Sequence, residues 1–506
     1  MRPLLLSAVS LFTLAACNSG RPFKQPKALT EWRPVRNVTA EAAEEDGAFR
    51  TSPPLPVATK PRPASLPTEV RLSNGIRVVM LERHDFPTVS AVLVLDRGAA
   101  AGAPGVASLY SEAMNGSSAE YKAAEAWQYL TFVGGSVAND TWRDGLALQV
   151  TALSPLFVAA LSRAAPMFSS PQLDGDDLDE ARARLAGENA SKDEDPAWVA
   201  YDALYASIFP SPHPYGTPVS GEPARLGRSK TAAKEKAASE VPSVAVKRFR
   251  DTHLSAEHVG VAVVGDFKPT SMQRIMENAL GKLPAHAKLA APEPVAPVAA
   301  KGGRKIIVID RPGAAQSNVA IGWPGPRASD ADLVTLDVLG GATAGDLSTR
   351  LNITVRKELG ASYGVHMSAD GLRVAGLVRI SAAIDTPKTN DALRGMLQEL
   401  ERLRVEPLSP AELAAAKLRT YADLERGSTR GLARYLAHAI VEGLPPAHVV
   451  THNALVDAVT AEAVRAAAEK YLAADDARIV VVGDASRIVE GLRALGVGDV
   501  SVAALR

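Results

Sequence analysis

Hydrophobic and polar residues alternate over the stretch "TEVRLSNGIRVVMLERHDFPTVSAVLVLDRGA", which runs from Thr68 to Ala99. The turn signal Asn74-Gly75 interrupts this alternation, and the pattern predicts a hairpin of paired strands. Apolar residues at helical spacing follow at Gly105–Asn115 and Glu120–Val133, and alternation returns in "SVANDTWRDGLALQVTAL". A last apolar strand, "HVGVAVVGD", is predicted to end at Asp266. Strands at both ends with helices between them are typical of an α+β domain.

The second half of the chain repeats this order of elements. "GRKIIVIDRPGAAQSNVAIGW" predicts paired strands, helical patterns follow, and Val481–Asp484 repeats the residues of Val263–Asp266. Between the halves, 285–303 is rich in Ala and Pro and has no core pattern, so we interpret it as a linker. We therefore predict two duplicated α+β domains, 68–284 and 304–506, each a mainly antiparallel sheet with helices packed on one face.

The N-terminus has the features of a signal peptide. Met1-Arg2 is followed by a short apolar run that ends in Leu-Ala-Ala-Cys, with Cys17 the only cysteine of the chain. This ending resembles a bacterial lipobox, in which the cysteine carries lipid, although an incidental cysteine in an ordinary secretory signal is the alternative. Residues 1–17 are thus predicted to be the signal. The polar, Pro-rich residues 18–67 are predicted to form a disordered tether. We expect a lipid-anchored protein of the bacterial envelope, on its periplasmic or outer surface.

Charge gives little indication of a nucleic-acid partner. The 506 residues include 56 Lys and Arg and 56 Asp and Glu, with no dense basic run. Without a net or local positive field, nucleic-acid binding is not expected.

The order and spacing of several segments resemble the pitrilysin/insulinase family of zinc peptidases. The resemblance runs from Val70 to Leu495 and rests on "NGIRVVMLERHDFPTVSAVLVLDRGA", Gly105–Ala107, "DPAWVAYDALYASIFPSPHPYGTPVSG", "DRPGAAQSNVAIGW" and "TRLNITVRKELGASYGV". It implies that the two domains face each other across a clam-like chamber.

In active members, the helix that begins Gly-x-Ala carries His-x-x-Glu-His, because residues at i and i+4 can reach one zinc while the Glu activates water. Alignment on Gly105–Ala107 places Ser108 at the first His, Ser111 at the Glu and Glu112 at the second His. None of these residues keeps the family's side chain. We interpret the serines as small residues that close a former metal site, and Glu112 as a helix-surface acid.

The family's third zinc ligand is a Glu on a later helix. Counting back from Asp195-Pro196, Glu180 matches the family's earlier acid and Gly187 the ligand position. Glu188 stands one place further on, a rotation of about 100° on a helix. No zinc is therefore expected on this chain.

The segment "VRKELGASYGV" resembles the family segment whose Arg and Tyr reach the substrate beside the zinc, and this match implies the pair Arg356 and Tyr363. A guanidinium can hold a peptide carbonyl, and a phenol can donate to a developing oxyanion. From the residues alone, a helix Arg paired with Glu358 or a neighbour, and a Tyr packed at a strand start, remain the alternative.

Loss of the zinc ligands with retention of the Arg/Tyr pair resembles the family's non-catalytic subunits, in which a homologous partner holds the zinc. The leading hypothesis is such a subunit, which contributes to peptide hydrolysis with a zinc-bearing partner. Two alternatives stay open: a peptide-binding or assembly protein with no proteolytic role, and an autonomous zinc peptidase that uses Glu112, Glu188 or displaced histidines.

Overall fold

The computed structural model describes residues 66–221, 241–288, 303–421 and 427–504. All of them belong to one compact unit, Pro63–Arg506. The predicted signal with Cys17, and the tether up to residue 65, lie outside the described residues, as does most of the predicted linker 285–303.

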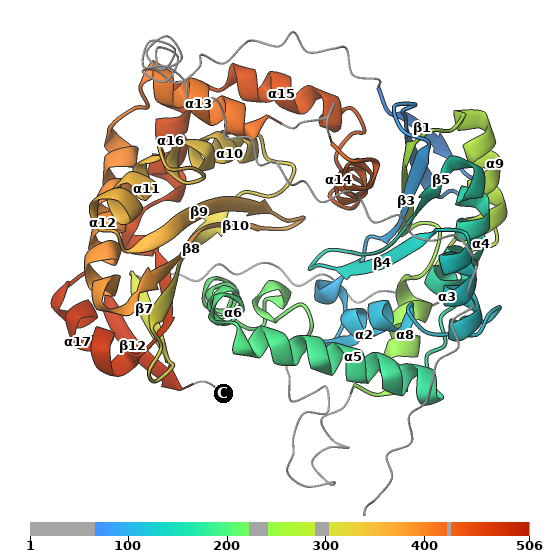
Figure 1. The fold of residues 1–506 in the computed structure, drawn as a ribbon, viewed down its shortest axis with the longest axis horizontal. Helices are drawn as coiled ribbons and strands as arrows, with labels where there is room; N and C mark the ends of the chain where they lie inside the picture. The colour runs from blue at the N-terminus through green and yellow to red at the C-terminus, as the bar shows by residue number, and fades with distance from the viewer. Residues whose placement is uncertain (1–65, 222–240, 289–302, 422–426, 505–506) are drawn as a thin grey trace, which may run out of the picture. The chain divides into compact units, whose positions relative to one another are not determined.

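The first half contains a six-stranded sheet with helices between its strands (Figure 1). In sheet order, the strands are β1 (Thr68–Arg71), β2 (Arg77–Glu82), β6 (Val259–Gly265), β3 (Thr88–Leu95), β5 (Leu146–Leu153) and β4 (Ser136–Thr141). In chain order, the helices and helical turns are η2 (Ala99–Ala101), α2 (Val106–Ala113), α3 (Ala123–Phe132), η3 (Ser154–Leu156), α4 (Phe157–Ser169), α5 (Gly175–Glu194), α6 (Pro196–Ile208), η4 (Pro214–Gly216), α8 (Ser243–His253) and α9 (Pro269–Leu280). The predicted hairpin is confirmed: β1 and β2 are antiparallel, and Gly75 adopts a φ of 99° in the turn between them.

The second half contains another six-stranded sheet. In sheet order, its strands are β12 (Asp499–Ala504), β7 (Lys305–Asp310), β11 (Arg478–Gly483), β8 (Gln316–Gly325), β10 (Gly376–Asp385) and β9 (Ser362–Gly371). Its helices and helical turns are α10 (Asp332–Thr343), α11 (Arg350–Asn352), η6 (Ile353–Glu358), η7 (Thr386–Lys388), α12 (Thr389–Val405), α13 (Pro410–Thr420), α14 (Thr429–Val441), α15 (His448–Ala458), α16 (Ala461–Tyr471), η8 (Ala474–Asp476) and α17 (Ala485–Ala494).

The duplication predicted from the sequence is confirmed by the strand order. In both halves, the strand that ends in Val-Val-Gly lies third in its sheet, parallel to one neighbour and antiparallel to the other. The next two pairings are antiparallel in both sheets. The sheets differ at one edge, where β1 pairs antiparallel with β2 but β12 pairs parallel with β7. The fold is therefore α+β, with two mixed sheets of corresponding topology.

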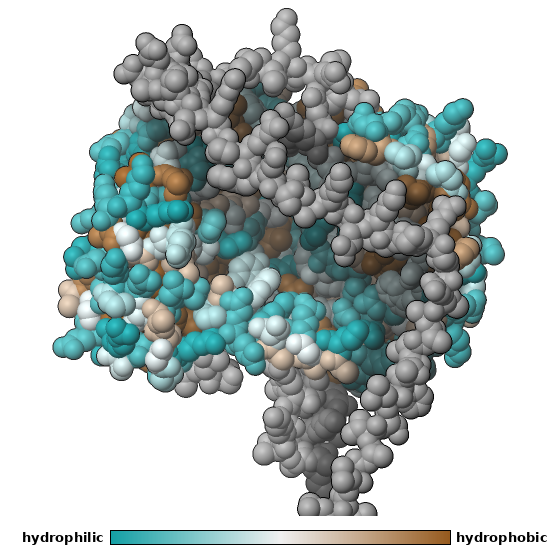
Figure 2. All heavy atoms as spheres, viewed as in Figure 1, coloured by the Kyte–Doolittle hydropathy of each residue, from teal (hydrophilic) through white to brown (hydrophobic). Residues whose placement is uncertain are grey.

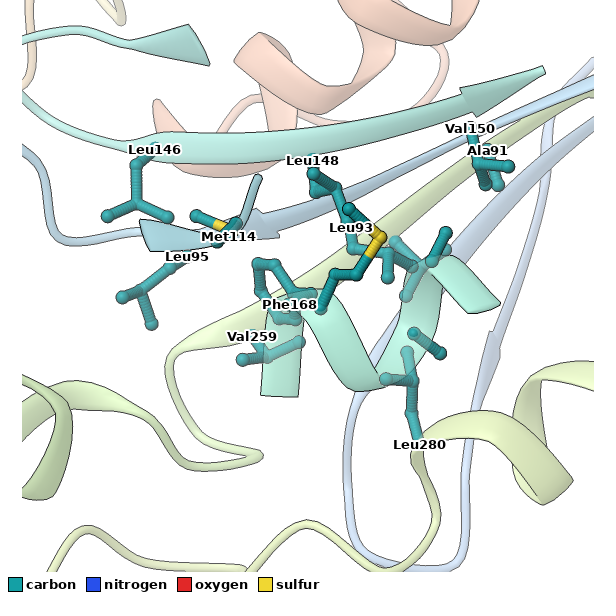
Figure 3. Close-up of a cluster of buried hydrophobic side chains, with 14 of the residues drawn as sticks. Ala91, Leu93, Leu95, Met114, Leu146, Leu148, Val150, Phe168, Val259 and Leu280 are labelled. Atoms are coloured by element: carbon teal, nitrogen blue, oxygen red, sulfur yellow. The ribbon is translucent and has the colours of Figure 1, made fainter. Parts of the chain in front are cut away.

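Alternate residues of the first sheet form its main core (Figure 3). Leu93 and Leu148 are paired across β3 and β5, and Phe168 of α4 is fully buried in the same cluster. Met114, just after α2, lies in this core as well. Burial of such side chains, at about 2 kcal/mol each, fixes the helix that contains the altered zinc positions against the sheet.

Each sheet also receives a helix from the other half on its second face (Figure 1). The α14 helix packs on β3 and β6, and the α6 helix packs on β8 and β11. Glycines permit both close approaches. A Cβ on Gly260 would lie 2.5 Å from Ile440 of α14, and one on Gly322 would lie 2.9 Å from Leu204 of α6. The halves thus exchange equivalent helices. The sequence predicted helices on one face of each sheet, and the structure adds one helix on the second face of each.

The turn between β9 and β10 makes a second, polar contact between the halves. The Asp144 carboxylate is buried and accepts hydrogen bonds from the Tyr215 hydroxyl at 2.5 Å and from the Arg373 backbone N–H at 2.8 Å. The Arg373 guanidinium donates to the carbonyls of Asp96 and Val441, both at 2.9 Å. This contact joins the hairpin of the second sheet to the first half.

On the face drawn in Figure 2, hydrophilic residues predominate among those described, and hydrophobic ones are scattered. Within the described ranges, no helix has both the length and the apolar character needed to cross a membrane.

Candidate functional site

Two of the positions aligned with the zinc motif are buried serines of α2. The Ser108 hydroxyl is 5% exposed and donates to the Val219 carbonyl at 2.8 Å. The Ser111 hydroxyl is 2% exposed and accepts from Asn139 Nδ2 at 3.1 Å. Asn139 lies on β4 and also donates to the Ser111 carbonyl at 3.0 Å. Both hydroxyls therefore hold the helix in place.

The third position, Glu112, is not the helix-surface acid predicted from the sequence. Its side chain is only 16% exposed. It accepts from Asn139 Nδ2 at 3.1 Å and from Arg184 Nε at 3.3 Å, and Arg184 Nη2 donates to its backbone carbonyl at 3.0 Å. The prediction is wrong because β4 and α5 both reach this turn of α2, which the helical pattern alone does not reveal.

The fourth position, Gly187, lies in α5 with open space where a side chain would start. Glu188 is half exposed and pairs with Lys192 at 2.7 Å, so it does not face the cluster around Glu112. Glu180 is 71% exposed and lies 3.8 Å from Arg184 Nη1. Arg184 is the residue that sequence reasoning missed, and the available signal was its place one helical turn before Gly187.

These residues do not fit a zinc ion. Zinc sites in proteins use Cys, His, Asp or Glu ligands, and the four positions together offer one carboxylate and two hydroxyls that are already hydrogen-bonded. The Glu112 carboxylate is paired with the guanidinium of Arg184, which is always charged and repels a divalent cation. Among the described residues, no group of three or more His, Cys, Asp or Glu side chains is arranged to hold a metal ion.

Arg356 and Tyr363 lie together at the other candidate site. Arg356 belongs to the π-helical turn η6, and Tyr363 is the second residue of β9. Arg356 Nη1 donates to the Tyr363 backbone carbonyl at 2.5 Å. The Tyr363 side chain is 86% exposed, so its hydroxyl is open to a ligand. The alternative drawn from the residues alone is met in part: Arg356 contacts a neighbouring residue and Tyr363 stands at a strand start, but the Tyr363 side chain is exposed instead of packed.

Both residues line a pocket of about 680 Å³ over the second sheet. Its walls come from the start of α6, from β8, β9 and β10, and from the loop 345–347. Within the part of the chain that the structure describes, β9 is an edge strand, so one side of this hairpin has no neighbouring strand there. A peptide could lie against such an edge and place one side chain in the pocket.

Two sheets of duplicated topology, exchanged helices and an altered helix define a peptidase-type fold in which the four positions aligned with the zinc ligands do not form a zinc site. The family model "Peptidase M16 inactive domain" matches residues 244–419. This match, together with the curated zinc proteases described next, confirms the resemblance to the pitrilysin/insulinase, or M16, peptidases noted from the sequence, and this chain lacks their His-x-x-Glu-His motif.

The curated relatives share about a quarter of their residues with this chain over the matched segments. An uncharacterized zinc protease of Streptomyces coelicolor is 25% identical over 56% of this chain, and the match spans 60% of that protein, less than two thirds of its length. An uncharacterized zinc protease of Mycobacterium tuberculosis is 24% identical over 73% of this chain and 80% of that protein.

Solved structures share the fold. A crystal structure of a peptidase M16 inactive domain from Pseudomonas fluorescens has a TM-score of 0.72 at 22% identity, covering 83% of this chain and 98% of that one. A protease from Helicobacter pylori has a TM-score of 0.74 at 19% identity, with 83% and 100% covered.

Proposed function

We propose that this chain is a catalytically degenerate subunit of an M16-type metallopeptidase of the bacterial envelope. It contributes Arg356 and Tyr363 to a peptide site, and a homologous partner with an intact His-x-x-Glu-His supplies the zinc. One observation carries the proposal: the Arg/Tyr pair lines an open pocket, while the four zinc positions lack a ligand set.

The two side chains suit different parts of peptide hydrolysis. The exposed Tyr363 hydroxyl can donate to the oxyanion that forms as the scissile carbonyl is attacked. The Arg356 guanidinium keeps N–H donors beyond the one used on the Tyr363 carbonyl, and these can hold a substrate carbonyl before and during the attack. Zinc in the partner would supply the attacking water.

The test uses the full chain, tagged at its C-terminus and purified from its own bacterium with the proteins that accompany it. We expect a homologue with His-x-x-Glu-His, zinc in the assembly, and hydrolysis of a quenched fluorescent peptide. Tyr363→Phe should lower kcat by about a hundredfold, the usual effect of losing one oxyanion donor. Arg356→Ala should lower kcat/KM without loss of the partner.

The matched control is Arg394→Ala, because Arg394 is an exposed arginine of α12 that pairs with Asp391 and does not line the pocket. The assembly that contains the Arg394→Ala chain should keep wild-type turnover. Unchanged turnover in both site variants, or an assembly that contains no zinc-bearing homologue, would contradict the proposal and favour a peptide-binding protein with no proteolytic role.

A further inference from the structure

The floor of the pocket is built from one face of the β8–β10–β9 sheet. Ser381 of β10 is paired with His366 of β9 on one side and with Ala320 of β8 on the other, so these three side chains share a face. Arg379 lies two residues from Ser381 and therefore points to the same face. All four residues line the pocket, and Ala320 also packs against α6.

The charged groups of the pocket are mainly positive. Its lining includes two guanidinium groups, Arg356 and Arg379, against the single carboxylate of Asp346, and the His366 imidazole is a further hydrogen-bonding group. Asp346 is already engaged, because it accepts from the Ser348 N–H at 2.7 Å and is paired with Arg419. The pocket therefore has no free carboxylate for a basic ligand group.

The donors on the floor are only partly used. Arg379 Nε donates to Asp370 at 3.2 Å, which leaves its other N–H groups, and its side chain is 31% exposed. The guanidinium lies 5.1 Å from the centre of the Tyr201 ring, which holds it in place. His366 is exposed and has no hydrogen-bond partner within the described residues.

We infer that this pocket binds a carboxylate of the peptide, through Arg379 and His366 on the floor, with Arg356 at the same opening. A carboxylate accepts charge-assisted hydrogen bonds from a guanidinium, and a partly buried site strengthens the attraction. The carboxylate can come from an acidic side chain or from the C-terminus of the peptide. The inference rests on the proposed function, since it names the class of peptide that the Arg/Tyr site receives.

The experiment measures binding of three matched peptides to the purified full-length chain, by anisotropy of a neutral fluorophore. One peptide has Gln at its centre and an amidated C-terminus, the second has Glu at its centre with the amide, and the third has the central Gln with a free C-terminal carboxylate. We expect at least one carboxylate peptide to bind about tenfold more tightly than the neutral one. The peptide that gains affinity identifies the source of the carboxylate.

Arg379→Gln should remove the preference for a carboxylate, while Arg394→Gln should keep it. Asp370 still accepts from Tyr205 and Ser368 in Arg379→Gln, so it is not left without a partner. His366→Gln, at an exposed position, should reduce the preference without affecting the fold.

Equal binding of all three peptides would overturn the inference and leave the proposed peptide site standing. Binding of none would overturn both. A third outcome is that the chain prefers a carboxylate peptide, while Arg356→Ala and Tyr363→Phe leave the partner's turnover unchanged. This outcome would support the inference and contradict only the catalytic part of the proposed function.

Discussion

The polar contact at the β9–β10 turn predicts a measurable loss of stability when Arg373 is replaced. Arg373→Met keeps most of the length of the side chain, which packs between the halves, and removes every guanidinium donor. The two carbonyls that it serves most closely, on Asp96 and Val441, each accept at 2.9 Å, and the Asp144 carbonyl accepts at 3.4 Å. The variant leaves both carbonyls without this donor.

The size of the effect follows from these two bonds. A hydrogen bond from a charged donor contributes about 1.5–3 kcal/mol net. The Arg373 side chain is 32% exposed, so water can partly replace it and the lower end of that range applies. We therefore expect Arg373→Met to lower the free energy of unfolding by about 3 kcal/mol, whereas Arg394→Met on the exposed face of α12 should change it by less than about 0.5 kcal/mol.

The assay is urea unfolding followed by circular dichroism, together with hydrogen exchange read by mass spectrometry. Exchange should rise in Leu372–Ala375 of the second half and around Asp96 of the first half, because both sides of the contact are released. An unfolding free energy within about 0.5 kcal/mol of wild type, with unchanged exchange in these two segments, would refute the claim that this turn joins the halves.

Three further predictions follow from other parts of the molecule. Burial and the nearby Asp144 carboxylate raise the pKa of Glu442 from 4.5 to about 7, so folding takes up a proton between these values and stability falls as pH rises through this window. Glu442→Gln should remove up to about 3 kcal/mol of this fall, measured as the difference in unfolding free energy between about pH 5 and pH 8. A variant whose unfolding free energy falls with pH as steeply as that of the wild type would contradict this prediction. Restoring the family's ligands should create a zinc site of about one ion per chain, measured by atomic emission, and zinc-free protein would contradict the assignment of these positions. The substitutions needed are Ser108→His, Ser111→Glu, Glu112→His and Gly187→Glu, combined with Arg184→Ala. Cys17→Ser should abolish labelling with radioactive palmitate in growing cells and release the chain from the membrane fraction, and persistent labelling would contradict the lipobox.

The sequence predicted the strands, the duplication and the helix after Gly105 because these depend on local periodicity and turn chemistry, whereas the altered zinc positions on that helix came from the family resemblance. Asn74-Gly75 and the repeated Val-Val-Gly strands are signals of this kind. The exchange of α6 and α14 could not be predicted in the same way. An apolar helix face shows that a helix is covered, but it does not show which sheet covers it.

The same limit applies to the candidate sites. The resemblance of "VRKELGASYGV" to a family segment implied the pair Arg356 and Tyr363, and the structure brings the two residues together. The pairing of Glu112 with Arg184 joins two helices far apart in the chain, so no short motif contains it. His366 and Arg379 became visible as pocket residues only through the register of β9 and β10.

The central claim is that peptide hydrolysis involving this chain uses a metal held by another subunit. The most direct test is the zinc content of the full-length chain purified alone, stripped with a chelator, incubated with zinc and dialysed, with peptide hydrolysis assayed on the same sample. The account predicts zinc close to zero per chain and no hydrolysis. About one zinc per chain together with hydrolysis would contradict it.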